Sequence, residues 1–94
     1  MSIKSFKDKS LEKCWRFAKC AKVDADLKER LLSKLDYLDA ATTIEDLKFP
    51  PSNNLHPLKE KLNGYHAISV NGPWRLIFEF SNGNAYKVFY DNYH

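Results

Sequence analysis

The sequence predicts an α+β domain in which two N-terminal helices pack on a mostly antiparallel sheet. Apolar residues before position 40 recur at intervals of three and four, which is the period of a helix buried on one side. Between positions 65 and 90 apolar residues alternate along the chain, which is the period of a strand. Short turn sequences at 71–73 and 81–84 separate the alternating runs, so the predicted sheet has a C-terminal three-stranded meander.

The length and composition fit one folded domain over residues 1–94. Hydrophobic residues make up 44% of the chain and aromatic residues 14%, with only three glycines, which distinguishes it from disordered and fibrous chains. No apolar run approaches the roughly 18 residues of a membrane span, and the charged first residues lack the apolar segment of a signal peptide. We therefore expect a cytoplasmic protein that does not bind membranes.

Two elements are expected before position 22. Residues Ser2 to Phe6 are predicted to form a short strand, and Ser10 is the expected N-cap of a helix over Leu11–Ala21. The core-facing residues of this helix fall at i, i+3, i+4 and i+7, namely Leu11, Cys14, Trp15 and Ala18. Cys14 and Cys20 lie about 240° apart around that helix, so we expect two reduced thiols and neither a disulfide nor a metal site.

A second helix is predicted from leucines spaced four, four and three apart, at Leu27, Leu31, Leu35 and Leu38. Either Asp24 or Asp26 caps its start, and it ends near the sequence AATT at 40–43. The stretch Thr42–Asn54 contains two prolines and two asparagines. It is therefore predicted to be a connector, with one short turn around Ile44–Leu47.

Three strands are predicted in the last third of the chain, from the runs YHAISVN, WRLIFEF and NAYKVFY. Alternation in the central run gives one face with Trp74, Leu76, Phe78 and Phe80, and another with Arg75, Ile77 and Glu79. Asn82-Gly83 suits a tight hairpin turn because both residues tolerate positive φ. The helices of the first half are expected to pack on one face of this meander.

Positive charge is concentrated near the start of the chain. Seven lysines and arginines lie between positions 4 and 22, against only Asp8 and Glu12, which gives this region a net charge of +5. Lys9, Lys13 and Arg16 share one face of the first predicted helix. This basic stripe is either a solvated helix face or a surface that binds nucleic acid, since a concentration of cations suits an anionic partner.

Cations and proton carriers are the candidate catalytic groups. His56 and Lys59 precede the meander, and Arg75 lies early in its central strand. His94 follows the last predicted strand by a few residues. Each of these residues, taken alone, also fits a structural or surface role. Arg75 could, for example, form an ion pair with Glu79.

Taken together, these groups suit metal-independent cleavage of RNA. That reaction needs a base for the 2′-hydroxyl proton, an acid for the leaving oxygen, and cations for the charge on phosphorus-bound oxygens. Two-metal nucleases instead need clustered carboxylates, which the sequence does not suggest. It also has no glycine-rich phosphate loop and no dinucleotide motif, so we expect no metal and no cofactor.

Several of these segments together resemble one protein family. The segment LHPLK, the hairpin GYHAISV with PWRLIFEF, and the final YDNYH resemble the HigB-type toxins of the RelE and ParE superfamily of bacterial toxin–antitoxin systems. The resemblance covers essentially the whole chain and is strongest over Leu55–His94. It implies a RelE-like fold and cleavage of mRNA in the decoding site of the translating ribosome, next to ribosomal RNA. It also implies a cognate helix-turn-helix antitoxin protein that neutralises the toxin.

The resemblance also carries site residues over, position by position. The family's LHPLK histidine and lysine, its strand arginine, and its final tyrosine and histidine fall on His56, Lys59, Arg75, Tyr93 and His94. We expect His94 to be the general acid and His56 the base, with Tyr93 stacking on a substrate base or holding the tail. Related sequences often end in YEDYH, whereas here Asn92 precedes the tyrosine and the acid is Asp91. Asn92, the remaining candidate, forms hydrogen bonds but cannot accept a proton as a carboxylate does.

Two other functions are weighed against RNA cleavage. A toxin of the ParE type would poison DNA gyrase, but a purely binding toxin has no use for imidazoles at His56 and His94. A non-enzymatic module would instead bind nucleic acid through Lys9, Lys13 and Arg16. A neighbouring gene for a helix-turn-helix protein that silences toxicity would favour the toxin.

Overall fold

An antiparallel sheet of four strands, in the order β1-β2-β3-β4, forms the centre of the protein. The structure, a computed structural model, describes residues 2–20 and 23–92. Its strands are β1 (His56–Pro57), β2 (Tyr65–Asn71), β3 (Trp74–Ser81) and β4 (Asn84–Asn92). The helices are α1 (Lys9–Phe17) and α2 (Ala25–Ala40), and short 3₁₀ turns connect α2 to β1 and β1 to β2. The predicted α+β class and the three-stranded meander are confirmed.

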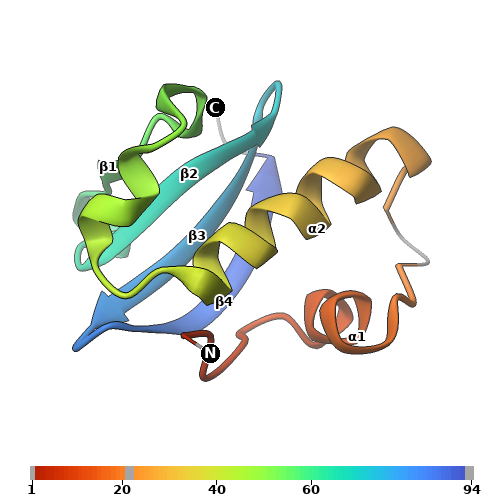
Figure 1. Ribbon diagram of the computed structural model, residues 1–94, viewed down its shortest axis with the longest axis horizontal. Coiled ribbons are helices and arrows are strands. Elements are labelled where there is room, and N and C mark those ends of the chain that lie inside the picture. The colour runs from red at the N-terminus through yellow and green to blue at the C-terminus, as the bar shows by residue number, and fades with distance from the viewer. Residues whose placement is uncertain (1, 21–22, 93–94) are drawn as a thin grey trace.

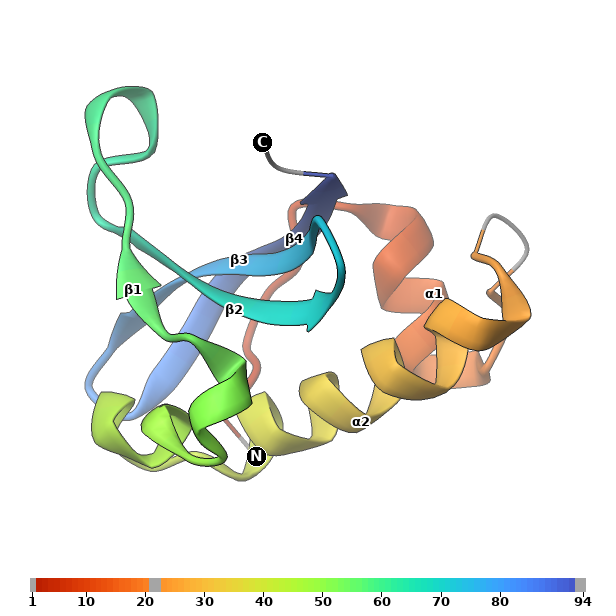
Figure 2. The same ribbon diagram turned by 90° about the horizontal axis from the view of Figure 1, so that it is seen from above.

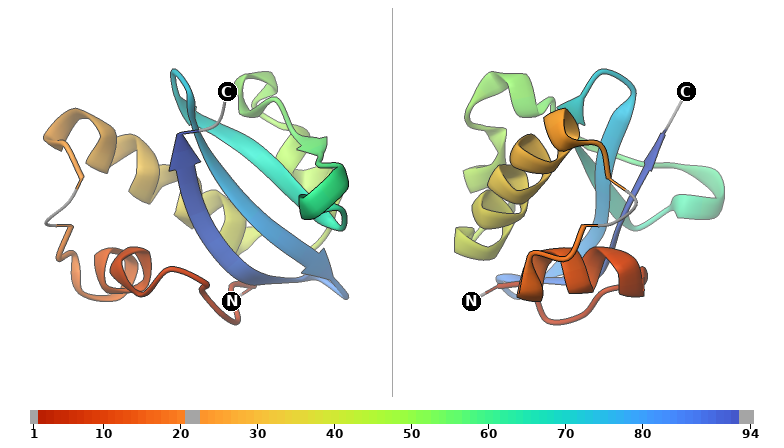
Figure 3. Two further views of the ribbon diagram at one scale, coloured as in Figure 1. Left: turned by 180° about the vertical axis from the view of Figure 1, so that it is seen from behind. Right: turned by 90° about the vertical axis from the view of Figure 1, so that its right-hand side faces the viewer.

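The two helices contact the sheet at different places, although Leu11 of α1 belongs to the same core cluster as the leucines of α2. Helix α2 runs across one face, and α1 lies beyond the edge formed by β4 (Figure 1; Figure 3). Figure 2 shows the opposite face, which α2 does not cover, bordered by the segment between β1 and β2 on one side and by α1 on the other. We call this second face the open face. Strand register gives it Tyr65, Ala67 and Ser69 of β2, Arg75, Ile77 and Glu79 of β3, and Phe89 and Asp91 of β4.

The main core lies between α2 and the sheet. All four leucines predicted to face the core from α2 are at most 6% exposed, and they belong to one cluster with Ile68, Leu76, Phe78 and Val88. Trp74 and Phe80 pack on the edge of the same cluster, as the alternation along β3 predicts. A smaller cluster of Leu58, Ala67 and Ile77 lies on the open face. Burial on both faces holds β3 firmly in the middle of the sheet.

Helix α1 is shorter than predicted and begins earlier. Its N-cap is Asp8, not Ser10, because Asp8 Oδ1 accepts hydrogen bonds from the backbone N–H groups of Ser10 (2.9 Å) and Leu11 (3.3 Å). The helix ends at Phe17, because Ala18 takes the left-handed conformation (φ 58°) and its N–H bonds to the carbonyl of Cys14. Ala18 is therefore an exposed cap and not a core residue, and Ala21 lies outside the described residues.

The prediction of two reduced cysteines is wrong. Cys14 and Cys20 form a disulfide, with their Cα atoms 4.5 Å apart. The prediction assumed that both cysteines lie on one continuous helix. Because the chain reverses at Ala18, the segment after the helix returns to its last turn and brings Cys20 against Cys14.

The N-terminal residues pair with β4 in parallel. The predicted strand at Ser2 to Phe6 appears as two isolated bridges, Ile3 with Ala85 and Phe6 with Val88. The backbone N–H of Lys7 continues this contact by bonding to the carbonyl of Val88 (2.9 Å). The first residues of the chain are thereby fixed along β4, beside the open face.

The connector between α2 and β1 is held from within by one asparagine. Asn53 is fully buried, and its Nδ2 donates to the carbonyls of Leu47 (3.1 Å) and Phe49 (3.2 Å). Lys34 of α2 donates to its Oδ1. The predicted turn is present over Ile44–Lys48. These contacts fix the chain just before β1, which carries a candidate site residue.

The turn that joins β3 and β4 has the predicted geometry. Asn82 (φ 52°) and Gly83 (φ 79°) are both left-handed, and a Cβ at Gly83 would approach the carbonyl oxygen of Thr42 to 3.0 Å.

Of the helices within residues 2–20 and 23–92, none has the length and apolar character needed to span a bilayer.

Candidate active site on the open face

Arg75 lies on the open face, next to the β2–β3 turn. It lies on β3, directly opposite Ser69 of β2 and Asp91 of β4. Its Nη1 donates to the carbonyls of Gly72 (2.6 Å) and Trp74 (3.1 Å), which fixes the guanidinium against the β2–β3 turn. Its Nε is buried and has no hydrogen-bond partner among the described residues. The side chain is therefore oriented while it retains donors for an anionic ligand.

Glu79 is not the partner of Arg75 in this structure. The Glu79 carboxylate pairs with Lys87, whose Nζ lies 3.0 Å from Glu79 Oε1. Lys87 lies at the irregularity in the pairing of β3 with β4 and has a left-handed backbone (φ 54°). The Glu79 carboxylate raises the pKa of Lys87 through a hydrogen bond and charge attraction.

His56 is oriented by a backbone carbonyl. It lies on β1 opposite Ala67, and its Nδ1 is 2.8 Å from the carbonyl oxygen of Asn54. A carbonyl oxygen only accepts hydrogen bonds, so Nδ1 carries the proton that it donates. In the neutral ring Nε2 is then left with its lone pair, which is the form that a general base requires.

His56 and Arg75 are brought to the same face by strand pairing. His56 is opposite Ala67 and Ala67 is opposite Ile77, two residues from Arg75. The backbones of the two candidates are therefore about 10 Å apart across the strands and about 7 Å apart along them. Both side chains belong to one face, and the Gly72 carbonyl that binds the guanidinium lies at the end of β3 farther from His56.

Lys59 shares a surface hollow with His56. The hollow has a volume of about 320 Å³ and is lined by His56, Pro57, Leu58, Lys59 and Glu60. Lys59 is exposed and directly precedes a 3₁₀ turn. Glu60, the first residue of that turn, has a left-handed backbone (φ 59°). The chain therefore turns sharply just after Lys59, at the border of the open face.

The register of β4 separates the two candidate polar residues at its end. Asn92 is opposite Trp74 and so lies on the α2 side, whereas Asp91 is opposite Arg75 on the open face. Asp91 Oδ1 accepts a hydrogen bond from the backbone N–H of Asn92 (2.8 Å). The structure thus brings a carboxylate beside Arg75 that was not among the sequence candidates. Tyr93 and His94 lie outside the described residues.

Comparisons with known proteins identify the family. A family model described as a RelE-like toxin of the type II toxin–antitoxin system HigB matches residues 4–94. The chain belongs to the HigB-like toxin family. The resemblance seen in the LHPLK and YDNYH segments is therefore confirmed.

Named relatives of this HigB-like toxin agree with the assignment. Endoribonuclease HigB of Proteus vulgaris is 39% identical over 92 residues, which cover 98% of this chain and 99% of that protein. Toxin HigB-1 of Vibrio cholerae is 37% identical over 87 residues, or 92% of each chain. The crystal structure of YafQ from E. coli strain BL21(DE3) has a TM-score of 0.52, with 19% identity over 92% of this chain and 88% of that one. At that identity the likeness supports the fold alone.

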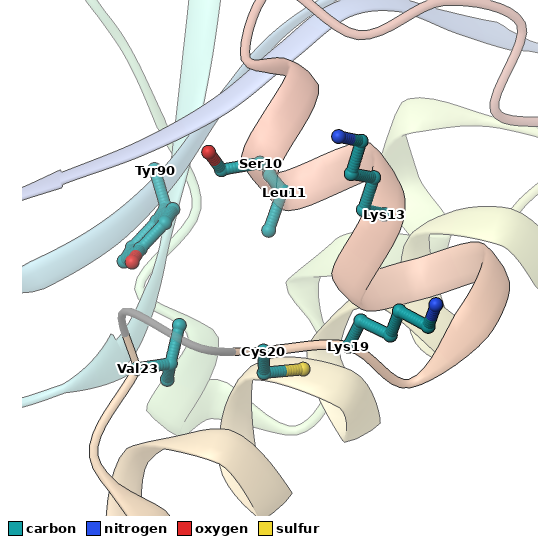
Figure 4. Close-up of a pocket in the computed structure, with 7 residues that line it drawn as sticks. All are labelled: Ser10, Leu11, Lys13, Lys19, Cys20, Val23 and Tyr90. Atoms are coloured by element: carbon teal, nitrogen blue, oxygen red, sulfur yellow. The ribbon is translucent and has the colours of Figure 1, made fainter.

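The basic stripe of this HigB-like toxin lies on α1, away from the centre of the open face. Lys9 and Lys13 are exposed, whereas Arg16 forms an ion pair with Glu12 (Nε to Oε2, 2.9 Å). Figure 4 shows the neighbouring cavity of about 250 Å³, in which Ser10 and Leu11 of α1 face Tyr90 of β4. Burial raises the pKa of Tyr90. The stripe is thus partly neutralised at its C-terminal end.

A third histidine, His66, lies on the α2 side of the toxin's sheet. Its ring stacks on Phe78, with centroids 6.4 Å apart, and its Nδ1 is buried with no hydrogen-bond partner within residues 2–20 and 23–92. Burial lowers the pKa of His66, and the nearby His56 lowers it further. His66 is therefore a neutral packing residue that does not face the candidate site.

The lowered pKa of His66 predicts a loss of stability in mild acid. Below the unfolded value of about 6.5, the unfolded chain binds the His66 proton more readily than the folded protein does. The free energy of unfolding should therefore be highest above pH 6.5 and fall as the pH drops toward the folded pKa. Urea unfolding between pH 5 and 7.5 measures this. His66→Phe should remove part of the slope, and an unchanged slope in that variant would contradict the prediction.

Proposed function

We propose that this HigB-like toxin is an endoribonuclease that cleaves mRNA on the translating ribosome and so inhibits translation. The observation that carries the proposal is that one face of the sheet presents both an imidazole and a guanidinium, those of His56 and Arg75, each held by backbone carbonyls. Similarity to the relative named Endoribonuclease HigB supports the same activity. The toxin would act in the cytoplasm, where translating ribosomes are found, and a cognate helix-turn-helix antitoxin would neutralise it.

In the proposed reaction, His56 Nε2 takes the proton from the 2′-hydroxyl of the nucleotide before the scissile bond. The 2′-oxygen attacks the adjacent phosphorus, and the bond from phosphorus to the 5′-oxygen breaks. The leaving 5′-oxygen takes a proton from His94, which we propose as the general acid. The products are a 2′,3′-cyclic phosphate and a 5′-hydroxyl, and no metal ion or cofactor takes part.

Charge stabilisation is the proposed role of the two cations. Arg75 faces the phosphate with the N–H groups that its turn carbonyls do not use, and these groups stabilise the negative charge that builds up on the phosphoryl oxygens. Lys59 supplies a second positive charge from the border of the same face. Tyr93 is proposed to stack on a substrate base. Asn92 is proposed to contribute hydrogen bonds only.

Primer extension on mRNA in a reconstituted translation reaction tests this function. We expect new 5′ ends within ribosome-bound message when toxin that was first treated with EDTA is added. No new 5′ ends should form when antitoxin is added before the toxin. Intact message together with cleaved DNA in a gyrase assay would support the ParE-type activity instead. Intact message with strong RNA binding would support the non-enzymatic module.

The basic stripe is expected to act in ribosome binding and not in chemistry. Replacing Lys9, Lys13 and Arg16 together with glutamine should weaken association with ribosomes and reduce the slope of log affinity against log salt by about two to three. Most of the change should come from Lys9 and Lys13, because Arg16 is paired with Glu12. Affinities measured at several salt concentrations check this, and an unchanged slope would make the stripe a solvated helix face.

A further inference from the structure

Two aromatic rings lie side by side on the open face, next to the candidate site. Tyr65 of β2 and Phe89 of β4 meet edge to face, with ring centroids 6.0 Å apart. Both rings are only partly buried, and they pack over the small cluster that contains Leu58 and Ile77. The main core does not use them, because it lies on the α2 side of the sheet.

A lysine from the N-terminal segment covers these rings. Lys7 Nζ lies 5.0 Å from the ring centroid of Phe89 and 5.9 Å from that of Tyr65. The backbone of Lys7 is anchored to the carbonyl of Val88 (2.9 Å), so its side chain starts from a fixed point at the sheet edge. Lys7 is exposed, so its ammonium covers the two rings from the solvent side through a cation–π contact.

The two rings lie at different distances along the sheet from Arg75: Phe89 at the level of Ile77, and Tyr65 farther away at the level of Glu79. Phe89 is opposite Ile77, and Ile77 lies two residues from Arg75 on β3. Two residues of a strand span about 7 Å. The Phe89 ring is therefore close enough to contact the nucleotide next to a phosphate held by Arg75, and Tyr65 extends the aromatic surface farther from Arg75.

The charges around the rings favour an anionic strand. The nearby Glu79 carboxylate is already neutralised by Lys87, at 3.0 Å. Lys7 lies over the rings and Arg75 lies beyond Phe89 as cations, and the other carboxylate of β4 on this face, Asp91, lies opposite Arg75. Aromatic faces beside cations are the arrangement with which proteins bind single-stranded nucleic acid, by stacking on bases and contacting phosphates.

We propose that Tyr65, Phe89 and Lys7 form a binding site for the nucleotide that flanks the scissile phosphate in single-stranded RNA. The base stacks on the aromatic pair in place of the Lys7 ammonium, and the ammonium moves to the neighbouring phosphate. This proposal rests on the proposed RNA cleavage, and it assigns substrate binding to residues outside the catalytic group. The site accepts any base with a free π face, because stacking alone does not read hydrogen-bonding edges.

Single-turnover cleavage of ribosome-bound mRNA tests the site kinetically. Phe89→Leu and Tyr65→Leu keep apolar packing but lose the stacking surface, and each should raise the half-saturating ribosome concentration about tenfold. The maximal rate at saturation should stay within about twofold of wild type. Lys7→Gln, which leaves the rings intact, should raise the same concentration and reduce its salt dependence. Lys48→Gln, an exposed lysine in the connector, is the matched control and should change neither.

A binding experiment separates this site from the cleavage activity. The probe is a hexaribonucleotide with a 2′-O-methyl group at every position that precedes a phosphate, so that it has no 2′-hydroxyl to attack phosphorus and cannot be cleaved. NMR of the labelled wild-type protein should show shifts of the Phe89 and Tyr65 ring resonances on addition of the probe, and Lys7→Gln should weaken the affinity. If wild type cuts no message, the proposed function fails, and these ring shifts still decide the binding site.

Two results would overturn the site. One is an unchanged half-saturating concentration in all three variants together with unshifted ring resonances. The other is loss of antitoxin binding in Phe89→Leu and Lys7→Gln with RNA binding unchanged, which would make the aromatic pair an antitoxin surface. Thermal unfolding of each variant shows whether it is folded. If Phe89→Leu or Tyr65→Leu is unfolded, Lys7→Gln still tests the site because it leaves both rings in place.

Discussion

Replacing Arg75 with alanine should lower the single-turnover rate of mRNA cleavage by roughly a hundredfold or more, about 3 kcal/mol of transition-state stabilisation. The reason lies in how the side chain is held. Two carbonyls of the β2–β3 turn bind Nη1, so the guanidinium is oriented before substrate arrives. An oriented donor loses little of its interaction energy to reorganisation, and its charge acts most strongly when the phosphoryl oxygens become more negative.

Two further variants separate chemistry from charge and from folding. Arg75→Lys keeps a positive charge but loses the planar fork, so it should recover only part of the rate. Arg30→Ala removes an exposed arginine from α2 and should cleave like wild type. Arg75→Ala should unfold at a temperature near that of wild type, because the side chain lies outside the main core. Full cleavage activity from a folded Arg75→Ala protein would remove Arg75 from the site.

The parts of the fold that follow from local patterns are predicted well. The leucine spacing of α2 places all four leucines in the core, and alternation along β3 separates Leu76 and Phe78 from Arg75 and Ile77. The Asn82-Gly83 turn follows from the conformational freedom of its two residues. In each case the conformation depends on the spacing or the backbone freedom of residues that are close together in the sequence.

The parts that fail depend on one backbone conformation or on contacts between distant residues. A left-handed Ala18 ends α1 early, and alanine gives no signal for that conformation. The same reversal forms the disulfide of Cys14 with Cys20, whereas helical spacing predicts two separate thiols. Strand β1 is only two residues long and pairs with residues about ten positions away. It is therefore too short to show the alternation of apolar residues from which strands are predicted.

The candidate site divides in the same way. His56 and Arg75 are recognisable as residue types, but their meeting on one face depends on the pairing of β1 with β2 and of β2 with β3. Asp91 was missed although a signal existed. Counting alternation back from the end of β4 places Asp91 on the face of Phe89 and Arg75, and Asn92 on the face of Trp74. The family resemblance at the tail points instead to Asn92.

The second large effect is expected at the two histidines assigned to proton transfer. His56→Ala and His94→Ala should each lower the maximal single-turnover rate by roughly 10² to 10⁴, with little change in ribosome affinity. For His56 the structural reason is the hydrogen bond from Nδ1 to the carbonyl of Asn54, which leaves Nε2 as the basic nitrogen. His66→Gln is the matched control, because it removes an imidazole from the other face of the same sheet and should cleave at the wild-type rate once its stability is checked.

The double variant carries the decisive information about mechanism. We propose that His56 removes the 2′-hydroxyl proton while His94 protonates the leaving oxygen in one transition state. Each histidine then contributes little to the cleavage rate when the other is absent. The rate of the double variant should then fall little below that of the slower single variant. Independent contributions, such as separate binding contacts, would instead multiply the two losses, because free energies of uncoupled sites add. A multiplicative loss measured at saturating ribosomes would therefore contradict the paired acid and base.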